Sequence, residues 1–92
     1  MTNSSASLDA RRKQLLYRAN HRGIKEMDIL LGGYAAEMLG ELADDALADF
    51  EALLDETDRD LLTWITGEKP APERVRTPVF DEILVRQQAR LA

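Results

Sequence analysis

The sequence predicts an all-α protein, a compact bundle of five short helices. β-branched residues are sparse and strict alternation of polar and apolar residues is absent, so no strand is expected. Apolar residues recur instead at helical intervals, and short turns separate the periodic segments. A chain of 92 residues is expected to form a single domain over residues 1–92.

The first helix is predicted from about Leu8 to Asn20, with Ser7 as its N-cap and with residues 1–7 flexible. Its expected buried stripe consists of Leu8, Leu15, Leu16 and Ala19. The basic side chains of this helix are left for solvent or for a partner: Arg11, Arg12, Lys13 and Arg18. A turn over residues 20–23 follows.

The second helix is predicted from about Ile24 to Leu39, where Gly40 suits its end. Projection at about 100° per residue places an apolar stripe on one side. The stripe consists of Ile24, Met27, Leu31, Tyr34, Ala35 and Met38. Arg22 and Glu26 project to the opposite, exposed side, and Asp28 lies at the edge of the stripe. The pair Gly32-Gly33 indicates a kink, a close approach of another backbone, or plain tolerance.

Three further helices complete the prediction. One begins near Asp44 and ends near Asp55, and Asp58 is expected to cap another over Arg59–Thr66, which Gly67 closes. Residues 68–76 form a connector, and Thr77 and Pro78 open the last helix. The expected core positions are Leu47, Phe50, Leu53 and Leu54, then Leu61, Leu62, Trp64 and Ile65, then Phe80, Ile83, Leu84, Gln87 and Leu91.

Composition narrows the class of protein. No apolar run approaches the roughly 18 residues of a membrane span, and no secretory segment precedes the first helix. The absence of cysteine fits a reducing, cytoplasmic setting. Residues 1–26 carry six basic and two acidic side chains, whereas residues 27–68 carry one basic and twelve acidic. Such an acidic middle argues against nucleic-acid binding.

No set of side chains predicts an enzyme or a metal site. His21 is the only histidine, so a zinc site would need three or four carboxylates, and a catalytic triad would need a serine from residues 4–7. The acidic run Glu37, Glu41, Asp44, Asp45 and Asp49 lacks the glycine and the alternation of a calcium loop and is read as a solvated face. Trp64 is expected in the core rather than stacked on a cofactor. By elimination, the chain is a binding protein.

The segment Arg22-Gly23-Ile24-Lys25-Glu26 has two interpretations. In the first, Gly23 is the N-cap of the second helix and the Glu26 carboxylate reaches back to the Gly23 N–H. That interpretation leaves Arg22 without a role. In the second, the exposed segment contacts a partner. The residues alone leave both open.

These residues carry a resemblance to the bacterial SdhE family and its mitochondrial relatives. The pattern Arg-Gly-x-x-Glu at residues 22–26, followed by Met27-Asp28, is similar to the motif of that family. A second block, Phe50 to Leu54 and then Asp58 to Pro70, is similar in order and spacing. The resemblance covers roughly residues 15–72. His21 stands where some members have arginine, and the start of the last helix departs from the family.

The resemblance implies a small assembly factor that binds the flavoprotein subunit of succinate dehydrogenase, and in some bacteria that of fumarate reductase. It implies promotion of covalent FAD attachment to a histidine of that subunit. It also implies a docking surface formed by Arg22, Gly23 and Glu26, with Asp28 as a supporting neighbour. No FAD is expected to be held by this chain itself. One alternative is an acidic helical adaptor or antitoxin-like protein that binds a basic partner through residues 44–60. Another is a small nucleic-acid binder that uses the helix from Arg11 to Arg22.

Overall fold

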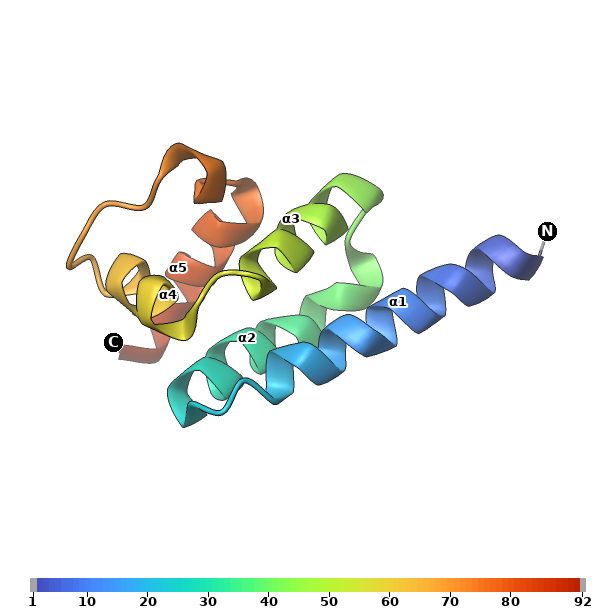
Figure 1. Cartoon of the computed structure of the whole chain (residues 1–92), viewed down its shortest axis with the longest axis horizontal. Helices are drawn as coiled ribbons and strands as arrows, with labels where there is room; N and C mark the ends of the chain where they lie inside the picture. Colours follow the sequence, from blue (N-terminus) through green and yellow to red (C-terminus); the bar gives the residue numbers. More distant parts are fainter. Residues whose placement is uncertain (1, 92) are drawn as a thin grey trace. The chain divides into compact units, whose positions relative to one another are not determined.

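The computed structural model describes the backbone of residues 2–91 and the side chains of residues 10–89. Over this range the chain forms five α-helices and two 3₁₀ turns without a strand, which confirms the all-α prediction (Figure 1). The helices are α1 (Thr2–Asn20), α2 (Lys25–Met38), α3 (Asp44–Leu54), α4 (Asp58–Ile65) and α5 (Pro78–Leu91). The 3₁₀ turns are η1 (Leu39–Glu41) and η2 (Glu73–Val75). The chain divides into two units, Met1–Glu41 and Leu42–Ala92.

In the first unit, α1 and α2 pack against each other as a helical hairpin that continues into η1 (Figure 1). The buried apolar residues are Leu15, Ala19, Met27, Leu30, Leu31, Tyr34, Ala35 and Leu39. Most of the predicted stripe of the second helix is therefore confirmed. Leu16, predicted to be buried, is exposed because it lies about 100° around α1 from Leu15, whereas Ala19, one turn on, stays buried.

The start of α1 differs from the prediction. The helix begins at Thr2 rather than Leu8, so Ser7 lies within the helix and is not its N-cap. Residues 2–7 contain neither proline nor glycine, so no helix breaker prevents the earlier start. The side chains of Ser7 and Leu8 lie outside those that the structure describes. The predicted flexibility of residues 1–7 concerns the same part of the chain and stays a prediction.

A side chain of α1 explains one of the two adjacent glycines in α2. A Cβ atom at Gly32 would lie only 2.8 Å from Cγ of Asn20, whose Nδ2 donates a hydrogen bond to the Leu16 carbonyl at 2.9 Å. The close approach expected at this pair therefore occurs at Gly32 only, and a side chain rather than another backbone makes it. A Cβ at Gly33 would meet nothing within 4 Å. Gly33 is therefore tolerated rather than required.

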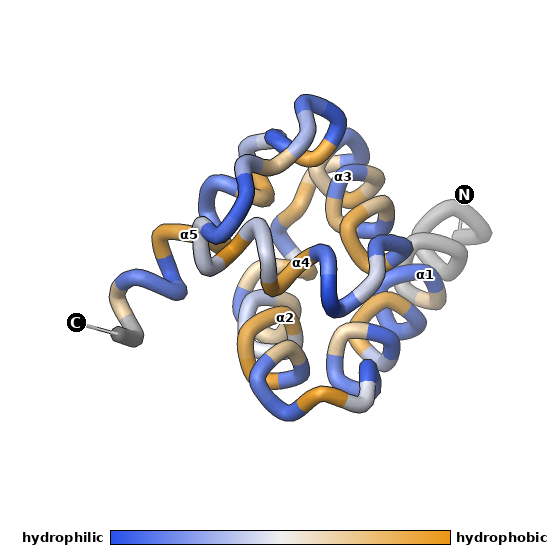
Figure 2. Tube along the Cα trace, turned by 60° about the vertical axis from the view of Figure 1, so that its left-hand side comes forward, coloured by the Kyte–Doolittle hydropathy of each residue, from blue (hydrophilic) through white to orange (hydrophobic). Residues whose placement is uncertain are grey.

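In the second unit, α3 packs against α5. The four core residues predicted for α3 are all buried, as are Leu61, Ile65, Phe80 and Ile83. Trp64 and Leu62 on α4, and Leu84 and Gln87 on α5, are half-buried, and the Leu91 side chain lies outside the described range. Val75 and Val79 are buried although the sequence pattern did not single them out. Figure 2 shows hydrophobic and hydrophilic positions alternating along α3 and α5, as amphipathic helices require.

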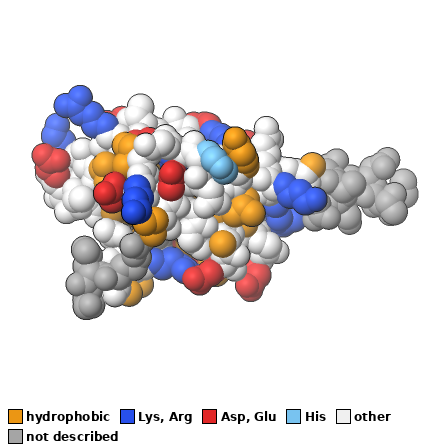
Figure 3. All heavy atoms as spheres, turned by 90° about the horizontal axis from the view of Figure 1, so that it is seen from below, with side chains coloured by type: hydrophobic (Ala, Val, Ile, Leu, Met, Phe, Trp, Pro, Cys, Tyr) orange, Lys and Arg blue, Asp and Glu red, His pale blue; other side chains and the backbone are white. Residues whose placement is uncertain are grey.

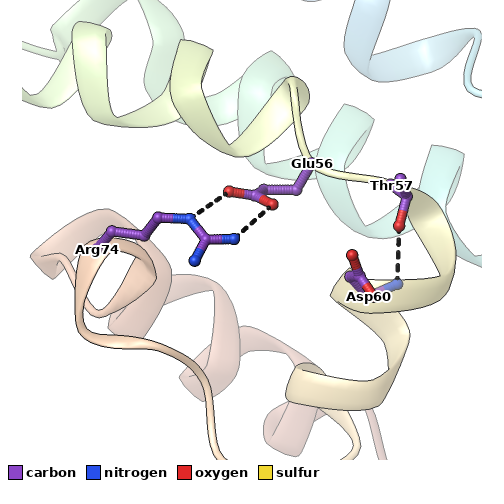
Figure 4. A network of polar contacts seen from close by, with 4 residues as sticks. All are labelled: Glu56, Thr57, Asp60 and Arg74. Atoms are coloured by element: carbon purple, nitrogen blue, oxygen red, sulfur yellow. Dashed lines mark hydrogen bonds and ion pairs between the residues drawn. The ribbon is translucent and has the colours of Figure 1, made fainter.

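The helix ends of the second unit depend on two threonines. Thr57, not Asp58, is the N-cap of α4, because its Oγ1 accepts a hydrogen bond from the Asp60 N–H at 3.1 Å while Asp58 already lies in the first turn (Figure 4). The prediction for the last helix is confirmed: Thr77 Oγ1 accepts from the Phe80 N–H at 3.2 Å and α5 begins at Pro78. Gly67 follows the end of α4 with a φ of +82°.

Arg74 of η2 joins the connector to the rest of the second unit. Its Nε and one terminal nitrogen each donate a hydrogen bond of 3.2 Å to a different carboxylate oxygen of Glu56 (Figure 4). Its guanidinium carbon also lies 5.8 Å from the centre of the Trp64 ring, within range of a cation–π interaction. Trp64 is therefore a half-buried residue with a cation beside its ring rather than a fully buried core residue.

Candidate functional site

The turn between α1 and α2 has a backbone conformation that favours glycine. Gly23 has a φ of +97°, which side chains other than glycine rarely adopt. The N-cap of α2 is Ile24, with φ −119° and ψ 120°, and it makes no side-chain capping bond. The prediction that Gly23 is the N-cap is therefore wrong. An N-cap takes extended backbone angles, and these occur one residue later than predicted.

Asp28 holds this turn from the α2 side. Its Oδ1 accepts a hydrogen bond from the backbone N–H of Arg22 at 2.7 Å. The predicted bond between the Glu26 carboxylate and the Gly23 N–H depended on Gly23 as the N-cap, and Glu26 instead occupies the second position of α2. Asp28, two residues further on and half-buried, closes the turn across six residues. The stabilising carboxylate is thus Asp28, and Glu26 points its charge to solvent.

His21 holds the same turn from the α1 side. Its Nδ1 lies 2.8 Å from the carbonyl oxygen of Tyr17, and because that oxygen can only accept, Nδ1 carries the proton. The imidazole is stacked on the Tyr17 ring with 3.9 Å between ring centres and an angle of 16° between planes. In Figure 3 the histidine side chain lies at the surface with hydrophobic side chains beside it. The carbonyls of Tyr17 and Arg18 in the last turn of α1 are therefore bonded by His21, the second through the His21 backbone N–H at 3.4 Å.

The four predicted site residues occupy one short segment that is open to solvent. Gly23 and Glu26 are exposed, while Arg22 and Asp28 are half-buried. A Cβ built on Gly23 would meet no atom within 4 Å, so the space next to this backbone is empty on its outer side. The structure thus joins Arg22 to Asp28 by a hydrogen bond and leaves Gly23 and Glu26 at the surface.

Sequence reasoning missed two residues next to this segment, Tyr17 and His21. Their separation of four residues places His21, the residue after the end of α1, beside Tyr17 in its last turn, and this spacing is the signal that could have found them. His21 was placed in the turn and considered as a metal ligand or as part of a triad, but it was not paired with Tyr17. Among the described residues, no group of three or more His, Cys, Asp or Glu side chains could hold a metal ion. Over the same range, no helix is long and apolar enough to cross a bilayer.

Comparison with known proteins gives related sequences over most of the chain. "FAD assembly factor SdhE" of Acetobacter pasteurianus is 37% identical over 84 residues, which cover 91% of this chain and 77% of the relative. "Succinate dehydrogenase assembly factor 2, mitochondrial" of Candida glabrata is 39% identical over 85 residues, which cover 89% of this chain and 54% of the relative. The same-named protein of Schizosaccharomyces japonicus is 44% identical over 62 residues, 67% of this chain and 43% of the relative.

The chain therefore spans about half the length of these mitochondrial relatives and a larger share of the bacterial one. Residues 13–87, which include the turn and all the residues that hold it, match the family described as the flavinator of succinate dehydrogenase. The resemblance to SdhE proteins predicted from residues 15–72 is confirmed and extends further in both directions. The chain belongs to the flavinator family of succinate dehydrogenase.

Proposed function

We propose that this chain is an assembly factor that binds the flavoprotein subunit of succinate dehydrogenase and promotes covalent attachment of FAD to it. The observation that carries the proposal is the turn at residues 21–24. His21 and Gly23 in this turn are exposed, and the space outside Gly23 is empty. The backbone of the turn donates hydrogen bonds on both sides, from the His21 N–H to the Arg18 carbonyl at 3.4 Å and from the Arg22 N–H to Asp28 Oδ1 at 2.7 Å. Family membership identifies the class of partner.

Each residue of the turn has a role in this proposal. Gly23 allows the backbone of the flavoprotein to approach where any side chain would stand in the way. Arg22 presents a guanidinium fork that fits a carboxylate, and the exposed Glu26 presents an acceptor. Asp28 supports the contact indirectly, because its bond to the Arg22 N–H fixes the direction in which Arg22 leaves the backbone.

The mechanism that we propose is positional. Covalent flavin attachment requires a histidine of the flavoprotein and the flavin to be held together in a reactive arrangement. A partner that binds this arrangement more tightly than the alternatives increases its population. The chain itself has no cysteine and a single histidine, whose ring is engaged with Tyr17. We therefore propose that it acts without catalytic residues of its own.

We further propose, first, that FAD is held by the flavoprotein and not by this chain. Second, we propose that this chain and the flavoprotein act in the cytoplasm, because a cysteine-free protein is suited to reducing conditions. A fluorescence titration of FAD with the isolated chain checks the first point. FAD binding is not expected to saturate at concentrations below about 100 μM. Saturation at about 1 μM, which corresponds to roughly 8 kcal/mol of binding free energy, would contradict the proposal that this chain holds no FAD.

Co-expression tests the function directly. The flavoprotein subunit of succinate dehydrogenase is produced with and without this chain, and covalently bound flavin is read as in-gel fluorescence after denaturation. The fluorescence is expected to rise strongly with the chain present. Running the fumarate reductase flavoprotein in parallel determines whether it is a second client. Equal flavin fluorescence of the succinate dehydrogenase subunit with and without the chain would refute the proposal.

A further inference from the structure

Large hydrophobic side chains are exposed at four described positions: Leu16 (36%), Tyr17 (63%), Ile29 (43%) and Val85 (64%). The first three belong to the α1–α2 hairpin, the unit whose two helices are joined by the turn at residues 21–24. A single exposed apolar residue is ordinary on a protein surface. Tyr17 differs from the others because it is the aromatic one and because its ring position is fixed.

Two interactions fix the Tyr17 ring. One face of the ring is stacked on His21 at 3.9 Å between centres, and the His21 ring is itself held by the bond from Nδ1 to the Tyr17 carbonyl at 2.8 Å. The pair is therefore ordered before any partner arrives, and little side-chain entropy remains to be lost on binding. Tyrosine offers a large contact area with few rotatable bonds, which is why it is enriched among the residues that dominate interface energies.

The Tyr17–His21 pair adjoins the turn, because His21 is the residue before Arg22 in the chain and the Tyr17 ring stacks on the His21 ring. The segment that carries the pair is basic: residues 10–26 contain six lysine or arginine side chains and one acidic side chain, Glu26, although Arg12 already donates from Nε to the Leu39 carbonyl at 3.1 Å. A basic surface is complementary to an acidic one. We therefore expect the matching surface of the partner to be acidic and to carry an apolar side chain that contacts the Tyr17 ring.

We propose that Tyr17 and His21 form the apolar part of the docking surface, extending it from the turn back along α1. Tyr17 contacts an apolar side chain of the flavoprotein, and the basic segment of residues 10–26 meets an acidic face of the same partner. This inference rests on the proposed function, because the occupant is the same flavoprotein subunit. His21 is the positioning residue that presents the Tyr17 ring.

The test compares two side chains of nearly equal exposure. The affinity of the purified chain for the FAD-free flavoprotein subunit is measured for Tyr17→Ala and for the control Val85→Ala on α5, whose side chain is 64% exposed against 63% for Tyr17. Tyr17→Ala is expected to lower the affinity at least about tenfold, in the range of interface residues that matter. Val85→Ala and Tyr17→Phe are expected to stay within about threefold of the wild type, since Phe keeps the ring.

Two further measurements make the outcome decisive. His21→Ala leaves the ring in place but unsupported, so an intermediate loss is expected, and thermal unfolding of each variant by circular dichroism verifies that all are folded. Raising the salt concentration is expected to weaken binding, as attraction between a basic and an acidic face requires.

The proposal is overturned if Tyr17→Ala binds within about threefold of the wild type, if Tyr17→Phe is as defective as Tyr17→Ala, or if duplex DNA displaces the flavoprotein from the chain. Gly23→Arg separates this failure from a failure of the proposed function. If Gly23→Arg abolishes flavin attachment while Tyr17→Ala changes nothing, only the extension of the surface is wrong. If the wild-type chain fails to promote attachment, the function itself is wrong.

Discussion

Gly23 and Gly67 have the same unusual backbone conformation at different places in the chain. Their φ angles are +97° and +82°, and a Cβ built on either would meet no atom within 4 Å. Any L-residue at these positions is therefore strained by about 1–2 kcal/mol, but neither has a neighbour that a side chain would strike. Gly67 follows α4 and lies outside the proposed docking surface. The two glycines therefore form a matched pair: a side chain at either position strains the backbone, but only Gly23 belongs to the proposed docking surface.

At the residue scale, we predict that Gly23→Ala and Gly67→Ala each lower the free energy of unfolding by about 1–2 kcal/mol. Urea denaturation followed by circular dichroism measures this loss. Flavin attachment in co-expression is expected to be abolished by Gly23→Arg and to be unaffected by Gly67→Arg, because only the first introduces bulk where the flavoprotein approaches. Equal loss of attachment in both arginine variants would show that instability, not obstruction, is the cause.

Among the helices, α2 contains the clearest distinction between a required and a tolerated glycine. Gly32 is buried and faces the Asn20 side chain of α1, whereas Gly33 is exposed with open space beside it. Alanine favours a helix interior over glycine by about 1 kcal/mol. At Gly32 that gain is opposed, because Asn20 must move and its hydrogen bond to the Leu16 carbonyl, of the order of 1 kcal/mol, is lost.

At the element scale, we predict that Gly33→Ala raises the free energy of unfolding by about 0.5–1 kcal/mol, and that Gly32→Ala does not raise it. Chemical denaturation of both variants measures the difference. In the Asn20→Ala background the obstacle is absent, so Gly32→Ala is expected to recover most of the gain seen at Gly33. A Gly32→Ala protein as stable as Gly33→Ala in the wild-type background would contradict the packing role of Asn20.

Over the whole molecule, basic and acidic side chains are concentrated in different parts of the sequence. Residues 10–26, which lead into and include the turn, carry six basic side chains, and twelve of the seventeen acidic side chains lie in residues 27–68. If the acidic part were the binding surface, the protein would be an adaptor for a basic target. If the turn is the binding surface, the acidic part is a solvated face. The two possibilities make opposite predictions for the same substitutions.

At the scale of the molecule, we predict that replacing the exposed residues Asp44, Asp45 and Asp60 together by asparagine leaves flavin attachment at the wild-type level. Asp44 and Asp45 lie in the first turn of α3 and Asp60 in the first turn of α4, so about 0.3–1 kcal/mol of favourable interaction with a helix dipole is lost at each. Unfolding of the triple variant is therefore measured alongside. Loss of attachment in a folded triple variant would favour the acidic surface as the binding site.

Local sequence was sufficient for most of the fold. The four-residue core of α3 follows from apolar spacing alone, and the start of α5 follows from Thr77 and Pro78, because both depend on interactions within a single turn of helix. The Arg-Gly-x-x-Glu segment was also identifiable as a candidate site, since a charged, glycine-containing corner stands out beside an apolar stripe. In the structure Gly23 and Glu26 of this segment are exposed and Arg22 is half-buried, and the role of the segment in binding stays a prediction.

Apart from the early start of α1 at Thr2, the sequence by itself determined where the five helices lie and which short segment is a candidate for binding. Only the tertiary structure decided how that segment is held. In the structure the N-cap of α2 is Ile24 and the Arg22 N–H donates to Asp28. The Asn20 side chain lies against Gly32, and the Tyr17 ring is stacked on His21 at the surface. The physical reason is the difference in sequence distance over which the interactions act. Helix propensity and capping act over three or four residues, whereas these contacts depend on the path of the chain through the turn and on how α1 packs against α2.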